Sequence, residues 1–386
     1  MNFDLTEDQI TFQTLAKSFS DKELKPHAAR WDADSEFPVE TIKKAGELGF
    51  CSLYVPEQYG GMGLGRLDAS IIIEQLAAGC TSTTAFMTIH NMATWMVSEF
   101  ASESLKEQWC PDLSSGNKLA SYCLTEPGSG SDAASLKTSA KRTDSGYVLN
   151  GTKSFISGSG ATDCLILMAR TGDSGPGGIS CFLVPGDAKG IEYGKNEKKM
   201  GWKSQPTRQI NLSDVEISHN SLIGKEGQGF KIAMQGLDGG RINIGTCSVG
   251  TAQAALEEAQ KYMNEREQFG KKISEFQALQ FKIADMTTEL VAARQMIRLA
   301  ASKIDSNHSE ASVYSAMAKR FATDVGFEVC NEALQIFGGY GYIQEYPLER
   351  YVRDVRVHQI LEGTNEIMRM LIGRRMMMEG ATKIIQ

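Results

Sequence analysis

The 386-residue sequence lacks the motifs that mark most nucleotide, metal and hydrolase sites. It contains neither GxGxxG nor GxxxxGKS/T, so neither a Rossmann nor a P-loop nucleotide site is predicted. HExxH, paired Cys/His ligands and the GxSxG nucleophile elbow are also missing, so zinc and serine-hydrolase chemistry have no support. We therefore expect no metal site, and a nucleotide cofactor would have to be held by other means.

Disulfide patterning and an excess of basic charge are missing as well. The eight cysteines form no CxxC pair, which predicts reduced and mostly buried thiols. The net charge of −7 argues against a nucleic-acid partner, and no apolar run approaches the length of a membrane span. The polar start, MNFDLTEDQ, resembles neither a signal nor a transit peptide. We expect a bacterial cytoplasmic protein, or a mitochondrial matrix protein if the chain is a processed form.

Three segments of different character follow one another along the chain. Residues 1–118 carry helical apolar patterns, and residues 119–225 carry short runs of β-branched and aromatic residues between turns. Residues 226–386 return to helical stripes. The pattern predicts an α+β protein with an N-terminal helical domain, a middle β-barrel or sandwich domain and a C-terminal four-helix bundle.

Several local signals make predictions that a structure can test. Thr6-x-x-Gln9 predicts a capping box at the start of the first helix. Asp68 is expected to cap the apolar helix that follows it. Asn150-Gly151, between two β-like runs, predicts a hairpin turn.

One glutamate stands at a break between two helical patterns. The first pattern includes Val355 and Leu361 and ends at Gly363, and the second begins at about Thr364. Glu362 therefore lies in a tight turn beside apolar neighbours. Burial there would raise its pKa toward neutrality, where a carboxylate serves best as a general base. The alternative is a solvated glutamate at a helix end.

The residues around this glutamate carry a family resemblance. Arg353-Asp354 and residues 359–366, QILEGTNE, resemble the C-terminal signature of the acyl-CoA dehydrogenases. In that family the glutamate at the position of Glu362 removes the α-proton of an acyl-CoA thioester. The resemblance covers essentially the whole chain and implies the family's three-domain fold.

Two motifs of the middle segment resemble the family's flavin site. Residues 122–132, YCLTEPGSGSD, are similar to the loop that cradles the FAD isoalloxazine ring, although a plain β-turn would fit the same residues. Phe155-Ile156-Ser157 stands where the family often has Trp-Ile-Thr packed on the flavin. Phenylalanine keeps an aromatic face but loses the indole N–H. An ordinary strand aromatic is the alternative.

Three motifs of the C-terminal segment complete the resemblance. Asp238-Gly239-Gly240-Arg241, expected just before the first bundle helix, is similar to the substrate-binding turn, and a surface salt bridge is the alternative. The run 266–270, REQFG, with the glutamine at 277, and the run 335–341, QIFGGYG, resemble elements that reach the FAD of a neighbouring subunit. A helix C-cap would also explain the paired glycines of the last run.

The resemblance assigns site residues one by one. It implies cofactor contacts for Tyr122, Cys123, Leu124, Thr125, Gly130, Ser131, Phe155, Ile156, Ser157, Arg266, Phe269, Phe276, Gln277, Gln335, Ile336, Phe337, Gly338, Gly339, Thr364, Asn365 and Glu366. It implies substrate contacts for Ser131, Asp238, Gly239, Gly240, Arg241, Gly363 and Arg374, with Glu362 as the catalytic base. Expected partners are an acyl-CoA substrate, electron-transferring flavoprotein and further copies of the chain, usually four in this family; no membrane or nucleic acid is expected.

The resemblance also points to a substrate class. Leu361 precedes Glu362 where straight-chain members of the family often have tyrosine, which fits an altered acyl pocket. The expected reaction is α,β-dehydrogenation of a short branched acyl-CoA, with isobutyryl-CoA of valine degradation first and 2-methylbutyryl-CoA or butyryl-CoA as alternatives. An acyl-CoA oxidase and a non-catalytic flavin-binding scaffold of the same fold are the further alternatives.

Overall fold

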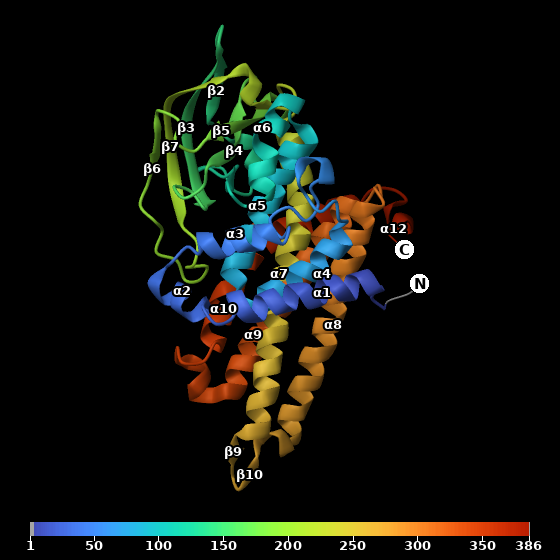
Figure 1. The fold of residues 1–386 in the computed structure, drawn as a ribbon. Helices are drawn as coiled ribbons and strands as arrows, with labels where there is room; N and C mark the ends of the chain where they lie inside the picture. The colour runs from blue at the N-terminus through green and yellow to red at the C-terminus, as the bar shows by residue number, and fades with distance from the viewer. Residues whose placement is uncertain (1–3, 386) are drawn as a thin grey trace.

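The computed structural model describes residues 4–385 and has a helical part at each end of the chain and a sheet between them (Figure 1). The capping box of Thr6 and Gln9 at the first helix is confirmed. The N-terminal helices are α1 Glu7–Phe19, α2 Ala28–Asp34, α3 Val39–Glu47, α4 Arg66–Gly79, α5 Thr81–Phe100 and α6 Glu103–Ser114.

The middle part is one sheet that covers the upper ends of α5, α6 and α7 in Figure 1. Its strands are β1 Ala120–Cys123, β2 Ser139–Arg142, β3 Gly146–Ser157, β4 Cys164–Arg170, β5 Ile179–Pro185, β6 Ile191–Tyr193, β7 Thr207–Ser218 and β8 Leu222–Ile223. The strand order is β6-β7-β3-β2-β4-β5-β8, and β1 pairs with β4 in parallel. The predicted fold class is therefore confirmed.

Strand β4 is buried on both faces, which explains its unbroken apolar sequence. Leu165 and Leu167 point into a core that the sheet forms with its own β3, β5 and β7. Ile166 and Met168, which alternate with them, pack against helices α5, α6 and α7. The sheet is thus fixed to the helical part through its central strand.

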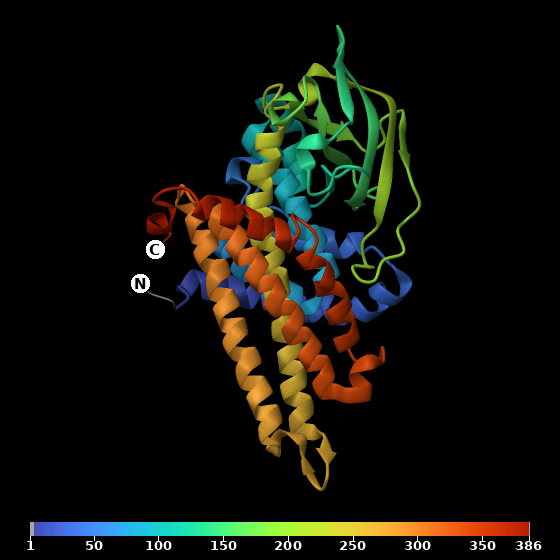
Figure 2. The same ribbon diagram turned by 180° about the vertical axis from the view of Figure 1, so that it is seen from behind.

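The C-terminal part is built on three long helices that pack side by side (Figure 2). Its elements are α7 Gly229–Glu265, β9 Glu267–Gln268, β10 Lys271–Lys272, α8 Gln277–Asp305, α9 Ala311–Phe337, α10 Leu348–Arg356, α11 Asn365–Met376 and α12 Ala381–Ile384. Helix α7 runs from the sheet through the centre of the molecule, and the short β9–β10 turn lies at its far end. Within residues 4–385, no helix is long and apolar enough to cross a membrane.

Two local predictions were wrong. Asn150-Gly151 is not a hairpin turn but a bulge inside the continuous strand β3, which stays paired with β7 on both sides of it. Asp68 does not cap α4, which begins at Arg66. The cap comes from a distant residue, because the Asp305 carboxylate accepts hydrogen bonds from the backbone N–H of Arg66 at 2.6 Å and of Leu67 at 3.0 Å.

The cysteines and two residues of the C-terminal signature have structural roles. All eight thiols are free and buried, as predicted.

Asp354 accepts a 2.6 Å hydrogen bond from the backbone N–H of Trp202, so α10 is tied to the loop before β7. Arg353 pairs with Asp32 of α2 at 2.6 Å and with Glu349 at 2.6 Å. These bonds anchor the segment that leads into Glu362.

Candidate active site

Glu362 lies in a tight turn between two helical segments, as the sequence indicates. Helix α10 ends at Arg356, and α11 begins at Asn365 with the Thr364 hydroxyl accepting from the backbone N–H of Ile367 at 3.3 Å. The φ angles of Glu362 and Gly363 are 55° and 89°. A left-handed conformation is costly for a residue with a Cβ, so the surroundings must hold Glu362 in place.

The carboxyl group of Glu362 packs directly on helix α7. A Cβ atom added at Gly240 would lie 2.5 Å from Glu362 Oε2, so this contact requires a glycine. Glu362 Oε2 is buried and has no hydrogen-bond partner among the described residues. An unpartnered buried carboxylate oxygen is free to accept a proton from a ligand.

This contact corrects one prediction about the run 238–241. The four residues lie inside α7 rather than in a turn before it. Gly240 therefore serves close packing and not a change of chain direction. Arg241 is buried, donates from Nη1 to Asp238 Oδ1 at 2.6 Å and from Nε to the Glu362 carbonyl oxygen at 3.4 Å. The structure thus brings Arg241 and Glu362 together, as expected.

The electrostatics of the turn suit a base that works near neutral pH. Burial raises the pKa of Glu362 to about 7, and the positive charges of Lys319 and Arg241 oppose that rise. A carboxylate with a pKa near neutrality is deprotonated often enough to act and basic enough to take a proton.

Sequence reasoning missed two buried cations, Lys319 beside the Glu362 turn and Arg66 beside Gly239. Lys319 of α9 is 0% exposed and lies at the Gly363 carbonyl. Arg66 of α4 is 6% exposed, its guanidinium carbon lies 3.4 Å from the centre of the Tyr54 ring, and its Nη1 has no partner within residues 4–385. A Cβ at Gly239 would lie 2.5 Å from that Nη1. In the sequence, Lys319 and Arg66 each appear as a charged residue within an apolar helical pattern, and this was the signal that could have identified them.

The loop that follows β1 leaves room for a ligand. Backbone hydrogen bonds between Glu126 and Ser129 close its turn at 3.0 and 3.1 Å. A Cβ added at Gly128 or Gly130 would meet no atom within 4 Å, so the chain itself does not fill the space beside them. Tyr122 is partly buried, and its Oη is buried without a partner within the described part of the chain. Burial raises the pKa of this tyrosine well above 10.

Phe155 presents an aromatic face beside this loop. Its side chain is 69% exposed although it lies within β3, and its φ angle of 58° follows from a register shift between Lys153 and Ile156. The Ser154 N–H donates to the Thr125 carbonyl at 2.9 Å, which joins this strand to the loop. An exposed ring, open glycines and an unpartnered hydroxyl fit a flat ring with polar edges, such as the isoalloxazine of FAD.

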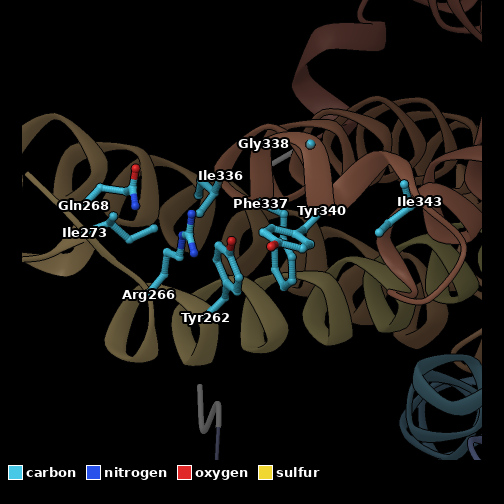
Figure 3. A pocket seen from close by; sticks show the side chains of 10 residues that line it. Tyr262, Arg266, Gln268, Ile273, Ile336, Phe337, Gly338, Tyr340 and Ile343 are labelled. Atoms are coloured by element: carbon cyan, nitrogen blue, oxygen red, sulfur yellow. The ribbon is translucent and has the colours of Figure 1, made fainter.

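A second group of predicted cofactor residues lies at the other end of α7. Arg266, Ile336, Phe337, Gly338 and Gly339 line one pocket of about 420 Å³ (Figure 3). Phe269, Phe276, Gln277 and Gln335 lie on the same segments. At 1.5 Å per residue, the 22 residues from Gly240 to Tyr262 put this pocket about 33 Å from the Glu362 carboxyl. The structure therefore brings each group together but keeps the two groups apart.

The remaining predicted residues lie around the start and end of α11. Asn365 is buried, and its side chain is engaged by Lys319 at 2.8 Å, Thr323 at 3.0 Å and Asp324 at 2.7 Å. Glu366 is exposed in the first turn of the helix, and Arg374 is exposed in its last turn. Their contacts with cofactor or substrate stay predictions.

Family comparisons agree with this arrangement. Three family models match: "Acyl-CoA dehydrogenase, N-terminal domain" over residues 6–117, "Acyl-CoA dehydrogenase, middle domain" over 121–215 and "Acyl-CoA dehydrogenase, C-terminal domain" over 227–377. The chain is 53% identical over 375 residues to the mitochondrial isobutyryl-CoA dehydrogenase of Bos taurus, and 52% over 373 residues to that of Dictyostelium discoideum. These alignments cover 97% and 96% of this chain and 90% of each relative.

Solved structures of similar proteins cover nearly all of the chain. Butyryl-CoA dehydrogenase from Megasphaera elsdenii has a TM-score of 0.95 at 38% identity, over 98% of this chain and 100% of that one. The structure of PigA with FAD and proline has a TM-score of 0.94 at 30% identity, over 97% of this chain and 99% of that one.

Proposed function

The chain belongs to the acyl-CoA dehydrogenase family, and we propose that it oxidises isobutyryl-CoA to methacrylyl-CoA, the dehydrogenation step of valine degradation. The protein is an FAD-dependent oxidoreductase that acts on acyl-CoA. The observation that carries the proposal is the Glu362 carboxyl, which packs on Gly240 and whose Oε2 is buried without a partner among the described residues. It stands where the family has its base.

In the proposed mechanism Glu362 removes the α-proton of the bound thioester. Gly240 leaves space for the carboxyl, and Arg241 holds the Glu362 carbonyl at 3.4 Å, so the base is oriented before the substrate arrives. The backbone N–H of Glu362 donates to the thioester oxygen, where negative charge develops. The apolar surroundings exclude water and strengthen this interaction.

FAD fits the open face beside Phe155. When bound, it supplies the two-electron oxidation that leaves a double bond between Cα and Cβ. In this chain the loop 122–131 and the strand segment 155–157 would hold the ring. Thr364 is the N-cap of α11. We propose that backbone amides there complete the site.

The choice of isobutyryl-CoA rests on two supports. The two relatives at 53% and 52% identity are isobutyryl-CoA dehydrogenases. Leu361, which packs against the core that contains Ile244 and Cys247, occupies the position where straight-chain members often have tyrosine. Butyryl-CoA is the second candidate, because butyryl-CoA dehydrogenase has nearly the same fold at 38% identity.

We further propose that electrons leave through electron-transferring flavoprotein and that the protein works as a homotetramer. The exposed pocket at the far end of α7 supports the assembly of several copies, because it holds predicted cofactor residues about 33 Å from Glu362. Such residues would complete the cofactor site of a neighbouring copy. Sedimentation of the flavin-bearing protein tests this, and a monomer that retains FAD would contradict it.

The visible spectrum of the purified protein tests the reaction and the substrate together. Flavin absorbance should fall on anaerobic addition of isobutyryl-CoA, and fall less with butyryl-CoA or 2-methylbutyryl-CoA at equal concentration. Bleaching by only another thioester would replace the substrate but keep the reaction. Turnover that makes hydrogen peroxide without an added electron acceptor would identify an oxidase instead.

A further inference from the structure

Lys319 is a fully buried lysine directly below the Glu362 turn. It belongs to α9, is 0% exposed, and its Nζ donates to the Gly363 carbonyl at 2.8 Å and to Asn365 Oδ1 at 2.8 Å. Full burial of a lysine is rare because desolvation of the ammonium group is costly. Neither acceptor is charged, so an ion pair does not explain its position.

We propose that Lys319 is a positioning residue, which holds the Glu362–Gly363 turn in its active conformation and favours the ionised form of the base through its positive charge. The proposal rests on the proposed function, in which Glu362 removes the α-proton. Lys319 touches neither substrate nor reacting atoms in this scheme and acts only through Glu362.

The geometric part of the proposal follows from two neighbouring carbonyl groups. The carbonyl of Glu362 accepts from Arg241 and the carbonyl of Gly363 accepts from Lys319. A left-handed glutamate followed by a left-handed glycine would relax unless its peptide groups were held. The two cations, from α7 and α9, hold it from two sides. Lys319 also fixes Asn365, the first residue of α11.

The electrostatic part follows from which charges face the turn. Arg241 is already paired with Asp238 at 2.6 Å, whereas the acceptors of Lys319 are neutral oxygens. The Lys319 charge is therefore the less neutralised of the two. The other charged groups that act on Lys319 are Asp324 of α9 and Glu366 of α11. The remaining titratable groups that face Glu362 are Tyr54, Tyr122 and Cys247, whose pKa values burial raises, so they stay neutral.

The pH range for a test follows from two values. Burial raises the pKa of Glu362 to about 7, and burial lowers the pKa of Lys319 to about 8. Between pH 5.5 and 7 the lysine is mostly charged while the glutamate titrates. Removing the positive charge should therefore raise the pKa of Glu362 further, by about one unit.

The experiment uses Lys319→Met and Lys319→Gln in the FAD-bound protein. Methionine fills the space without charge or donor, and glutamine keeps one donor without charge. Lys199→Met is the matched control, because Lys199 also binds two oxygens, at 2.7 Å each, and burial also lowers its pKa to about 8. Infrared difference spectra, with Glu362→Gln as the blank, report the protonated carboxyl of Glu362 directly, without turnover.

We expect the Glu362 titration to move up in both Lys319 variants and to stay in place in Lys199→Met. At pH 6 kcat/KM should fall about tenfold, and the loss should shrink toward pH 8. Lys319→Met should lose more than Lys319→Gln, because it also frees the Gly363 carbonyl. If Lys319→Met does not fold, Lys319→Gln carries the same measurement.

An unmoved Glu362 titration in the folded Lys319 variants would overturn the proposal. So would a loss of kcat that is the same at every pH and in the control, since that would indicate general damage. An infrared shift without a matching shift in the pH profile of kcat/KM would instead keep the action of Lys319 on Glu362 and reject Glu362 as the base. Failure of the proposal for Lys319 and failure of Glu362 as the base are thus distinguishable.

Discussion

The two ends of helix α7 are built in opposite ways, although predicted cofactor residues lie near both. At the Glu362 end the side chains are closely packed: the carboxyl lies on Gly240, and Lys319 is 0% exposed. At the Arg266 end, Phe269 is 92% exposed, and a Cβ added at Gly338 would meet no atom within 4 Å. At one end this chain supplies the groups packed around the base, and at the other end the chain leaves surfaces uncovered.

This difference separates two tasks. The proton affinity of a base depends on burial and on fixed charges within a few ångströms, which one folded chain can supply. A long dinucleotide cofactor needs contacts over a greater span, and the α7 axis puts the second group of residues about 33 Å from the base. We infer that the chemistry belongs to one chain, while cofactor retention needs a second copy.

Glu362→Gln should have the largest effect on turnover, and it should change only the Glu362 end of α7. The amide matches the carboxyl in shape but cannot take a proton, so turnover should fall by about 10³-fold or more. FAD absorbance and the sedimentation coefficient should not change, because the far end is untouched. Stopped-flow bleaching with isobutyryl-CoA measures the loss, and Glu107→Gln on exposed α6 is the control. Normal bleaching in Glu362→Gln would remove the residue from its role.

Gly240→Ala should have the next largest effect. The new Cβ would lie 2.5 Å from Glu362 Oε2 and 3.0 Å from its Cδ, so the carboxyl must move. Displacement of a base by about 1 Å costs about 100-fold in kcat. The thermal midpoint should not fall in proportion, because alanine stabilises a helix relative to glycine by about 1 kcal/mol.

Gly239→Ala is the comparison that sharpens this prediction. Its Cβ would meet the Arg66 guanidinium at 2.5 Å rather than the base. The Cβ at Gly239 contacts Arg66 and not the base, so a smaller loss of kcat is expected. Equal losses in the two variants would show that general damage to α7, and not contact with Glu362, is responsible.

The sequence predicted what depends on near neighbours along the chain. The turn at Gly363, the helix start at about Thr364 and the Thr6 capping box are set by residues within a few positions of one another, and the structure has all three. Asn150-Gly151 carries an equally good local signal, yet pairing of β3 with β7 continues past it. Tertiary pairing overrode a local preference, and a single sequence does not show the partner strand.

The two missed cations show the same limit at the site. Lys319 and Arg66 come from α9 and α4, remote in sequence from Glu362, and each looks like one charged residue in an apolar helix. Their importance appears only when the helices pack, and Asp305 caps α4 for the same reason. The base and Arg241 were predictable from their motifs, whereas Lys319, the other cation that acts on the Glu362 carboxyl, was not.

Phe269→Ala tests the Arg266 end of α7 and should have a moderate effect on FAD retention. With 92% of its side chain exposed, Phe269 contributes little to the core, so the thermal midpoint of the chain without FAD should stay the same. Loss of one aromatic stacking contact should weaken FAD retention about tenfold. Equilibrium dialysis measures retention, and Ile10→Ala on α1, also exposed, is the control. Unchanged retention and unchanged activity would show that this end has no role in cofactor binding.

Arg66→Met should have the smallest effect, and its sign is informative. The guanidinium is buried without a partner for Nη1, so its removal relieves a desolvation cost while the stacking on Tyr54 is lost. These terms oppose each other, and the thermal midpoint should move by only a few degrees. Turnover should fall several-fold, because the guanidinium packs on Gly239, next to the Gly240 contact of the base. Arg30→Met, on an exposed surface, should change neither quantity. If turnover and stability fell together, the cation would be part of the packing; a fall in turnover alone means that buried charge at this end serves the chemistry.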